Sequence, residues 1–370
     1  MHLAFLNPQG NFDPNDSYWT EHPDFGGQLV YVKNVALALA DLGHRVDIIT
    51  RRIVDSEWPE FESREDGYDG RVRILRIDCG DDNTFLRKED LWPYLGRDWV
   101  PGIIDYYRSE GQLPEAATGH YGDGGLAAAM LRDLAGIPYT FTGHSLGAQK
   151  FDKLLASGES YETLDHHYRF SRRLEGERTA MNHAGVVVTS TAQERFDQYG
   201  HTAYQGAIDP RDDTRFSVIP PGVALDVFGA NVRHPGELEV EHLVDRQLRR
   251  DIAADRLTLP TVGASSRLDP KKNPVILAEA FATNSELQEK ANLVFITGAL
   301  EDPLRSDLGA GVTELAVLRD LRNTAESSGL HGKVAAFGVQ GQAALSGVYR
   351  YLARRRSVFA LTALYEPFGL

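Results

Sequence analysis

The sequence predicts an α/β protein made of two doubly wound domains. Three observations carry this prediction. Short apolar runs alternate with helical patterns along the whole chain, this alternation occurs twice, and polar or glycine-rich segments follow several of the runs. Alternating strands and helices are typical of an open parallel sheet with helices on both faces. The length of 370 residues also suits about two domains.

The first set of strands is expected before residue 220. Between its first two strands, Val32, Val35, Ala36 and Leu39 repeat at helical spacing, and Gly43 follows as a stop signal. This spacing predicts one helix that packs on the sheet. The predicted strands of the first set are His2–Leu6, Arg45–Thr50, Arg71–Ile77, Ile137–Thr142, Gly185–Ser190 and Phe216–Ile219.

The second set begins near Leu259, after a Pro-Pro-Gly turn at 220–222 and an acidic stretch at 235–241. We therefore expect one domain over residues 1–235 and a second over 236–370. A complete domain of this type has about five to seven strands, so we expect the second domain to be incomplete and the chain to be a fragment. The strands predicted in it are Thr261–Ser265, Asn292–Thr297, Lys333–Phe337 and Ser357–Leu361.

Composition narrows the class of partner. The formal net charge of −14 argues against nucleic-acid binding, which needs a basic surface. Cys79 is the single cysteine, which excludes an internal disulfide and favours a reducing, cytoplasmic setting. No signal-peptide pattern or long apolar segment occurs, so we expect no membrane association. The sequence gives no indication of the oligomeric state.

A cluster of cations predicts a phosphate site in the second domain. Arg267, Lys271 and Lys272 lie between a predicted strand and a predicted helix that starts near Pro274. Arginine offers a planar fork of donors, lysine a point charge, and a helix start adds free N–H groups. Because the chain as a whole is acidic, such a local cluster indicates a specific anion.

Phe25-Gly26-Gly27-Gln28 lies between the first strand and the first helix. Paired glycines there allow the backbone to approach a ligand closely. The alternative is a plain turn at a helix start. The segment does not match G-x-G-x-x-G, so the nicotinamide-type fingerprint is absent from it.

Gly143-His144-Ser145-Leu146-Gly147 matches the G-x-S-x-G pattern of α/β-hydrolases, in which Ser145 would be the nucleophile. Small residues should then follow, yet polar and charged ones do, including Lys150. The hydrolase alternative also gives no function to the cations at 267–272. A polar pocket wall is the favoured interpretation.

A second group of cations comprises Lys88, Lys150, Arg172 and Arg173. Each alone is typical of a solvated surface charge, and the two arginines could form helical i,i+4 pairs with nearby glutamates such as Glu177. Taken with Gly26, Tyr121 and Ser145, they predict a phosphate cage.

Three further features complete the sequence-based prediction. The polar, glycine-rich segment 120–125 follows a probable strand end and is a candidate part of a site. The alternative is an ordinary turn with a capping Asp. Glu366, which precedes a proline, would ordinarily be a turn residue. It is a candidate site residue because we expect it to lie opposite the loop at 267–272. Zinc-type Cys/His spacing, H-E-x-x-H and the Walker motif are missing, so neither a metal nor a cofactor is expected.

Together these segments resemble the retaining GT-B glycosyltransferases that include sucrose synthase and sucrose-phosphate synthase. The resemblance covers essentially the whole chain, and the stretches at 143–150 and 172–177 are most similar to bacterial sucrose-phosphate synthases. It implies two Rossmann-like domains that face each other across a cleft. It rests on the order and spacing of Asn7-Pro8-Gln9-Gly10, Gly26-Gly27-Gln28, Gly143–Gly147, Pro220-Pro221-Gly222, Ser265–Asp269, Lys272-Asn273 and Glu366–Leu370.

The resemblance also implies a reaction and a set of residues. Glucose would pass from UDP-glucose to fructose 6-phosphate with retention, giving sucrose 6-phosphate and UDP, without a metal ion. Catalytic roles would fall to His144 at the sugar and to Arg267, Lys272 and Glu366, and the last three with Gly27 would bind the donor. The acceptor would contact Gly26, Gln28, Lys88, Tyr121, Ser145, Lys150, Arg172 and Arg173.

The family has a second glutamate eight residues after the one matched by Glu366, and that position lies beyond Leu370. Whether this chain binds the donor is therefore left open. Three alternatives remain beside the hydrolase: a mannosylfructose-phosphate synthase that uses GDP-mannose, a sucrose synthase that uses unphosphorylated fructose, and a non-catalytic fragment that binds a sugar phosphate.

Overall fold

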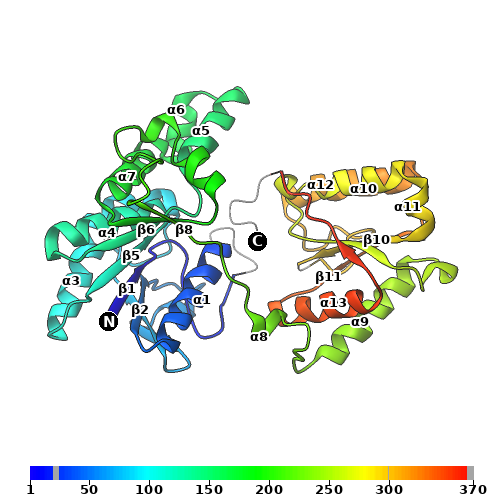
Figure 1. The fold of residues 1–370 in the computed structure, drawn as a ribbon, viewed down its shortest axis with the longest axis horizontal. Helices are drawn as coiled ribbons and strands as arrows, with labels where there is room; N and C mark the ends of the chain where they lie inside the picture. Colours follow the sequence, from blue (N-terminus) through cyan, green and yellow to red (C-terminus); the bar gives the residue numbers. More distant parts are fainter. Residues whose placement is uncertain (20–24, 299, 365–370) are drawn as a thin grey trace. The chain divides into compact units, whose positions relative to one another are not determined.

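The computed structural model describes residues 1–19, 25–298 and 300–364. The chain divides into two compact units, one over Met1–Pro221 and one that begins at Gly222 (Figure 1). The boundary expected from the sequence, between residues 235 and 236, lies inside the second unit.

The first unit is built on an eight-stranded sheet, in the order β3-β4-β2-β1-β5-β6-β7-β8, in which only the edge strand β3 is antiparallel to its neighbour. All six strands predicted from the sequence are present, and two further strands, β3 and β5, were not predicted. The strands are β1 (His2–Leu6), β2 (Arg45–Arg51), β3 (Glu65–Tyr68), β4 (Val72–Ile77), β5 (Ala116–His120), β6 (Tyr139–Thr142), β7 (Val186–Thr189) and β8 (Phe216–Val218).

Strand β5 escaped prediction because its sequence, Ala-Ala-Thr-Gly-His, lacks the branched apolar residues that mark a strand. The structure requires small residues there. A Cβ atom on Gly119 would lie 2.7 Å from the carbonyl oxygen of Gly124, at the start of the next helix. Because β5 packs closely against this helix, it consists of small residues, and these do not mark it as a strand in the sequence.

Helices cover both faces of this sheet. Phe5 of β1 belongs to a core shared with Val32 of the first helix, whereas Ala4 and Leu6 point into the opposite core. The helices are α1 (Gly27–Asp41), α2 (Trp92–Tyr94), α3 (Val100–Ser109), α4 (Tyr121–Ala135), α5 (Gly147–Ala156), α6 (Tyr161–Tyr168) and α7 (Phe170–His183), with short turns η1 (Pro59–Phe61), η2 (Lys88–Asp90), η3 (Leu95–Trp99), η4 (Glu194–Gln198) and η5 (Thr202–Tyr204).

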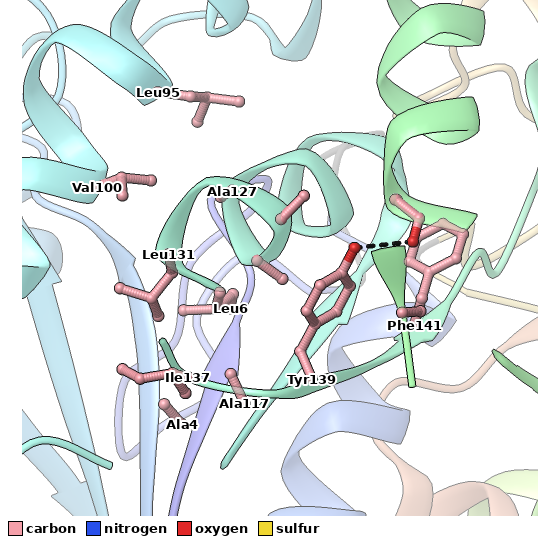
Figure 2. Close-up of a cluster of buried hydrophobic side chains, with 14 of the residues drawn as sticks. Ala4, Leu6, Leu95, Val100, Ala117, Ala127, Leu131, Ile137, Tyr139 and Phe141 are labelled. Carbon is pink, nitrogen blue, oxygen red and sulfur yellow. Dashed lines mark hydrogen bonds between the residues drawn. The ribbon is translucent and has the colours of Figure 1, made fainter. Parts of the chain in front are cut away.

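Figure 2 shows part of the second of these cores, where Leu131 of α4 and Val100 of α3 lie over the strands. Tyr139 is buried among them, and its hydroxyl donates a hydrogen bond to the carbonyl oxygen of Ala180 at 2.8 Å. This bond satisfies the one polar atom of the ring and ties β6 to α7.

The second unit has a four-stranded parallel sheet, and its four strands are those that the sequence predicted. Their order in the sheet is β11-β10-β9-β12. Its strands are β9 (Thr261–Ser265), β10 (Asn292–Thr297), β11 (Val334–Gly338) and β12 (Val358–Phe359). Its helices are α8 (Leu225–Phe228), α9 (Glu237–Asp251), α10 (Pro274–Thr283), α11 (Ser285–Lys290), α12 (Val312–Ser327) and α13 (Gln342–Arg354), with turns η6 (Ala254–Arg256) and η7 (Pro270–Lys272).

Two separate cores form on the faces of this sheet. One includes Phe281 of α10 and Leu318 of α12, and the other includes Val244 of α9 and Val348 of α13. Within the described part of the chain, no helix combines the length and the apolar character that crossing a membrane requires.

Candidate functional site

A pocket in the first unit gathers charged and aromatic side chains, and we call it the cationic pocket. It brings together four of the residues predicted for the acceptor, namely Lys88, Tyr121, Lys150 and Arg173. They come from η2, α4, α5 and α7, which are far apart in the sequence. The remaining lining residues are Glu89, Trp92, Asp123 and Tyr168.

The start of α4 is shaped to reach this pocket. Tyr121, its first residue, has φ of +63°, a left-handed conformation that costs free energy for a residue with a side chain. A Cβ atom on Gly124 would lie 2.4 Å from the carbonyl oxygen of Leu6, so only glycine lets the helix start so close to β1. This packing sets Tyr121 at the carboxyl end of the sheet, where ligands bind in such folds.

Arg173 is held rigidly in the cationic pocket. Its side chain is almost fully buried, and Nε donates to Oε1 of Glu177 at 2.8 Å. Nη2 donates to the carbonyl oxygen of Ser145 at 2.5 Å, and the guanidinium lies 4.6 Å from the ring centroid of Tyr121. Burial opposes the charge, but Tyr121 and Glu177 outweigh it and raise the pKa of Arg173 above its ordinary value.

Glu177 is the anchor of this arrangement. It is fully buried and accepts hydrogen bonds from the backbone N–H of Gly147, at 3.0 and 3.1 Å, and from the hydroxyl of Tyr204. The sequence suggested an i,i+4 pair between an arginine and Glu177 as the ordinary alternative to a site. The pair with Arg173 exists, but inside the protein, where it orients Arg173.

The two lysines complete the positive charge of the pocket. Nζ of Lys150 lies 4.2 Å from the ring centroid of Tyr168, a cation–π contact that positions the ammonium group. Nζ of Lys88 lies 3.9 Å from Oε1 of Glu89, at a distance where the attraction is weak. Three cations, Lys88, Lys150 and Arg173, thus line the pocket together with the carboxyl groups of Glu89 and Asp123.

Four of the predicted acceptor residues do not line the cationic pocket: Ser145 and Arg172, and also Gly26 and Gln28 at the start of α1. The side chain of Ser145 is exposed, and only its carbonyl oxygen takes part, as the acceptor from Arg173. Arg172 is exposed in a neighbouring surface groove with Glu175. Trp92 lines both the groove and the pocket, and so lies between them.

Gly26, Gly27 and Gln28 form the start of α1. Gly26 is extended, and among the described residues no atom lies within 4 Å of a Cβ atom placed on Gly26 or Gly27. Packing against the described residues therefore does not require glycine at these two positions. Gln28 Nε2 donates to Oδ1 of Asn7 at 2.6 Å, which fixes its side chain toward the loop after β1.

His144 and His120 form a buried pair at the ends of β6 and β5. Nε2 of His144 lies 2.9 Å from Nδ1 of His120, and the ring of Tyr31 meets His144 edge-on at 5.2 Å between centroids. Burial lowers the pKa of His120 to about 3, and burial followed by the proximity of His120 lowers the pKa of His144 well below its usual value. Both rings are neutral, so one donates and the other accepts.

The hydrolase alternative fits this geometry poorly. The left-handed residue of the turn is His144, with φ of +57°, rather than Ser145. His144 directs Nε2 to His120, and among the described residues no histidine bonds to the exposed Ser145 hydroxyl. A serine nucleophile requires such a base within hydrogen-bond reach.

In the second unit, Arg267 and Lys272 share the loop between β9 and α10. Arg267 is exposed and Lys272 is half-buried. Asp269 shapes the loop by accepting from the backbone N–H of Lys271 at 2.9 Å, and Asn273, with φ of +51°, turns the chain into α10. The loop therefore presents three cations, counting the exposed Lys271, beside a helix start that has no side-chain cap among the described residues.

The segment after β12 runs along this loop. Thr362 donates to the carbonyl oxygen of Lys272, and the backbone N–H of Leu364 donates to that of Lys271, both at 2.9 Å. The reason is topological, because β12 pairs in parallel with β9 and both strands end at one edge of the sheet. Glu366 lies outside the described residues.

Sequence reasoning missed several lining residues of the cationic pocket. A capping role for Asp123 was the alternative considered for its segment, but Asp123 lies inside the first turn of α4, whose N-cap is His120, and its Oδ1 accepts from the N–H of Gly124 at 2.7 Å. Trp92 and Tyr168 are single aromatic residues without a local motif, so no sequence signal marked them. Among the described residues, no group of three or more His, Cys, Asp or Glu side chains is arranged to hold a metal ion.

Comparisons with known proteins bear on both units. A family model described as a glycosyl transferase 4-like domain matches residues 26–198. The whole chain is 41% identical to a probable sucrose-phosphate synthase of Thermosipho melanesiensis and covers 78% of that protein. It is 32% identical to the sucrose-phosphate synthase of Zea mays over 94% of its own length, but spans only 37% of the maize protein.

Solved structures share the fold. The sucrose-phosphate synthase of Thermosynechococcus elongatus matches with a TM-score of 0.65 at 22% identity, over 100% of this chain and 77% of that one. The Anabaena protein HepE, solved with UDP and glucose, matches with a TM-score of 0.54 at 16% identity, over 100% of this chain and 76% of that one. These matches confirm the predicted α/β fold of the GT-B class.

Proposed function

The chain belongs to the sucrose-phosphate synthase family of glycosyltransferases, and on that premise we propose that it transfers glucose from UDP-glucose to fructose 6-phosphate. The products are sucrose 6-phosphate and UDP, and the anomeric configuration of glucose is retained. The observation that carries the proposal is the convergence of Lys88, Lys150 and Arg173 in one pocket.

The cationic pocket is assigned to the phosphate of the acceptor. A sugar phosphate carries between one and two negative charges near neutral pH, and charge-assisted hydrogen bonds from lysine and arginine are the strong ones. Because the protein as a whole carries a net charge of −14, these three cations offset a general repulsion of anions. Unphosphorylated fructose would gain nothing from them, which disfavours the sucrose synthase alternative.

The loop at 267–272 is assigned to the diphosphate of the donor. Arg267 and Lys272 would stabilise the charge that develops on UDP as the glycosidic bond breaks. N–H groups at the start of α10 would add partial positive charge, as helix starts do for phosphates. Gly27 would let the backbone of the first unit approach the donor, while Gly26 and Gln28 would contact the acceptor.

The transfer itself needs alignment and charge stabilisation. The bond from the glucose anomeric carbon to the diphosphate oxygen breaks, and the new bond forms to the acceptor hydroxyl on the same face. The proton of that hydroxyl passes to the departing diphosphate. The neutral ring of His144 would hydrogen-bond the sugar without adding charge, and Glu366 is assigned a hydrogen bond to the donor sugar.

A donor and acceptor matrix tests this proposal. The purified chain is assayed for nucleotide release with UDP-glucose, ADP-glucose and GDP-mannose, each against fructose 6-phosphate and fructose. We expect release of UDP with the phosphorylated acceptor. Preference for GDP-mannose would favour the mannosylfructose-phosphate synthase, and binding of fructose 6-phosphate without release of any nucleotide would favour the non-catalytic fragment.

A further inference from the structure

Asp123 places a carboxyl group inside a pocket otherwise suited to anions. Its side chain is 1% exposed and lines the cationic pocket with Lys88, Lys150 and Arg173. Oδ1 accepts from the backbone N–H of Gly124 at 2.7 Å. Oδ2 is buried and has no hydrogen-bond partner among the described residues. A buried polar atom without a partner costs free energy, so a ligand that pairs with Oδ2 would gain from it.

The charge state of this carboxyl decides what Oδ2 can do. An ionised carboxylate only accepts hydrogen bonds and would repel a phosphate, whereas the acid has one O–H to donate. Burial raises the pKa of Asp123 to about 7, although the N–H of Gly124, Arg173 and Arg51 favour the charged form. The acid is therefore well populated at neutral pH.

Neighbouring charged groups oppose the effect of burial on the ionisation of Asp123. Arg173 faces it from α7 and Arg51 from β2, and both favour ionisation. The thiol of Cys79, whose pKa burial raises to about 12, is neutral. The other titratable groups of the pocket are Tyr121, Lys88, Glu89, Lys150 and Tyr168.

We propose that Asp123 is a further acceptor-binding residue, which in its neutral acid form donates a hydrogen bond from Oδ2 to an oxygen of the bound phosphate. The inference rests on the proposed function, because it takes the ligand of the cationic pocket to be a sugar phosphate. Arg173 and the lysines supply the charge, and Asp123 supplies a donor that exists only while it is protonated.

A proton linkage follows from this role. Above neutral pH the free protein has lost the proton of Asp123, and binding takes it up again from the buffer. Affinity for fructose 6-phosphate therefore falls with rising pH, by about fivefold from about pH 7 to about pH 8. The ligand changes little in that range, because its own second pKa is about 6.

Isothermal titration of the whole chain with fructose 6-phosphate tests the inference. Titrations at several pH values from about 6.5 to 8.5, in two buffers of different ionisation enthalpy, give both the affinity and the protons taken up. In the wild-type protein we expect falling affinity and an uptake that approaches one proton. In Asp123→Asn, whose amide donates at every pH, we expect neither the fall nor the uptake.

The matched control is Asp133→Asn, on the same helix α4, where the carboxylate is 60% exposed and pairs with Arg132. It should titrate like the wild-type protein. Equal pH dependence in wild-type protein and Asp123→Asn, or no proton uptake by the wild-type protein, would overturn the inference while leaving the proposed function intact. If the wild-type protein bound no fructose 6-phosphate at any pH, the proposed function would fall, and the inference with it.

Discussion

Arg173 and Glu177 form a buried ion pair one turn apart on α7, with Nε 2.8 Å from Oε1. Glu177 also accepts from the first N–H group of α5, and Arg173 reaches the carbonyl oxygen of Ser145. The pair thus joins the cationic pocket to the turn that carries His144. Breaking it should disturb stability and acceptor binding together.

Glu177→Ala should lower the free energy of unfolding of the first unit by about 3–5 kcal/mol, because it leaves the buried charge of Arg173 uncompensated. Tryptophan fluorescence during urea unfolding reports this unit selectively, since all 4 tryptophans of the chain lie before residue 100. Glu175→Ala, an exposed change on the same helix, should shift the free energy by less than about 0.5 kcal/mol. Equal effects of the two changes would contradict the anchoring role.

Lys150→Ala should raise the KM for fructose 6-phosphate by about tenfold to a hundredfold, the worth of one charge-assisted hydrogen bond. Nucleotide release at varied acceptor concentration measures it. Lys153→Ala, an exposed lysine on the same helix, serves as the control and should leave KM unchanged. An unchanged KM in Lys150→Ala would show that the phosphate of the acceptor does not bind in this pocket.

The buried histidines predict an acid-sensitive first unit. Burial depresses the folded-state pKa of His120 from 6.5 to about 3, so the unfolded chain binds protons that the folded chain does not. Stability is therefore fully present above about pH 6.5 and falls as the pH drops toward 3, by up to about 1.4 kcal/mol per pH unit for each histidine. Urea unfolding at several pH values should show a shallower fall in His120→Asn than in the wild-type protein. Parallel curves would indicate that His120 titrates normally.

Substitutions at two glycines should distinguish a position that is required for stability from one that is required for activity. In Gly124→Ala the added Cβ atom would lie 2.4 Å from a carbonyl oxygen, so we expect a loss of about 1–3 kcal/mol of stability. In Gly27→Ala it meets no atom of the described residues within 4 Å, so the unfolding curve should not move. The kcat/KM for UDP-glucose should nevertheless fall by about tenfold, because a methyl group fills the space that the ligand needs. Full activity in Gly27→Ala would exclude close contact there.

How far the sequence predicts this structure depends on whether a feature is local. The position of Arg267 and Lys272 between a strand and a helix start was predicted correctly, because strand, cations and helix follow one another within a few residues. Strand β5 was missed because tight packing at Gly119 requires small residues, which carry no strand signal.

The cationic pocket was only partly predictable for the same reason. Tyr121, Lys150 and Arg173 meet because α4 and α5 both pack on α7. No sequence pattern could select Arg173 over its neighbour Arg172. The second carboxyl oxygen of Asp123 became notable only when its burial was known. Whether the predicted residues bind donor and acceptor stays a prediction.

A crystal structure of the chain with fructose 6-phosphate tests the central claim most directly. The account predicts density for the phosphate within hydrogen-bond distance of Lys150 and Arg173, beside Asp123. Density for the ligand elsewhere, with the cationic pocket filled by solvent, would contradict it.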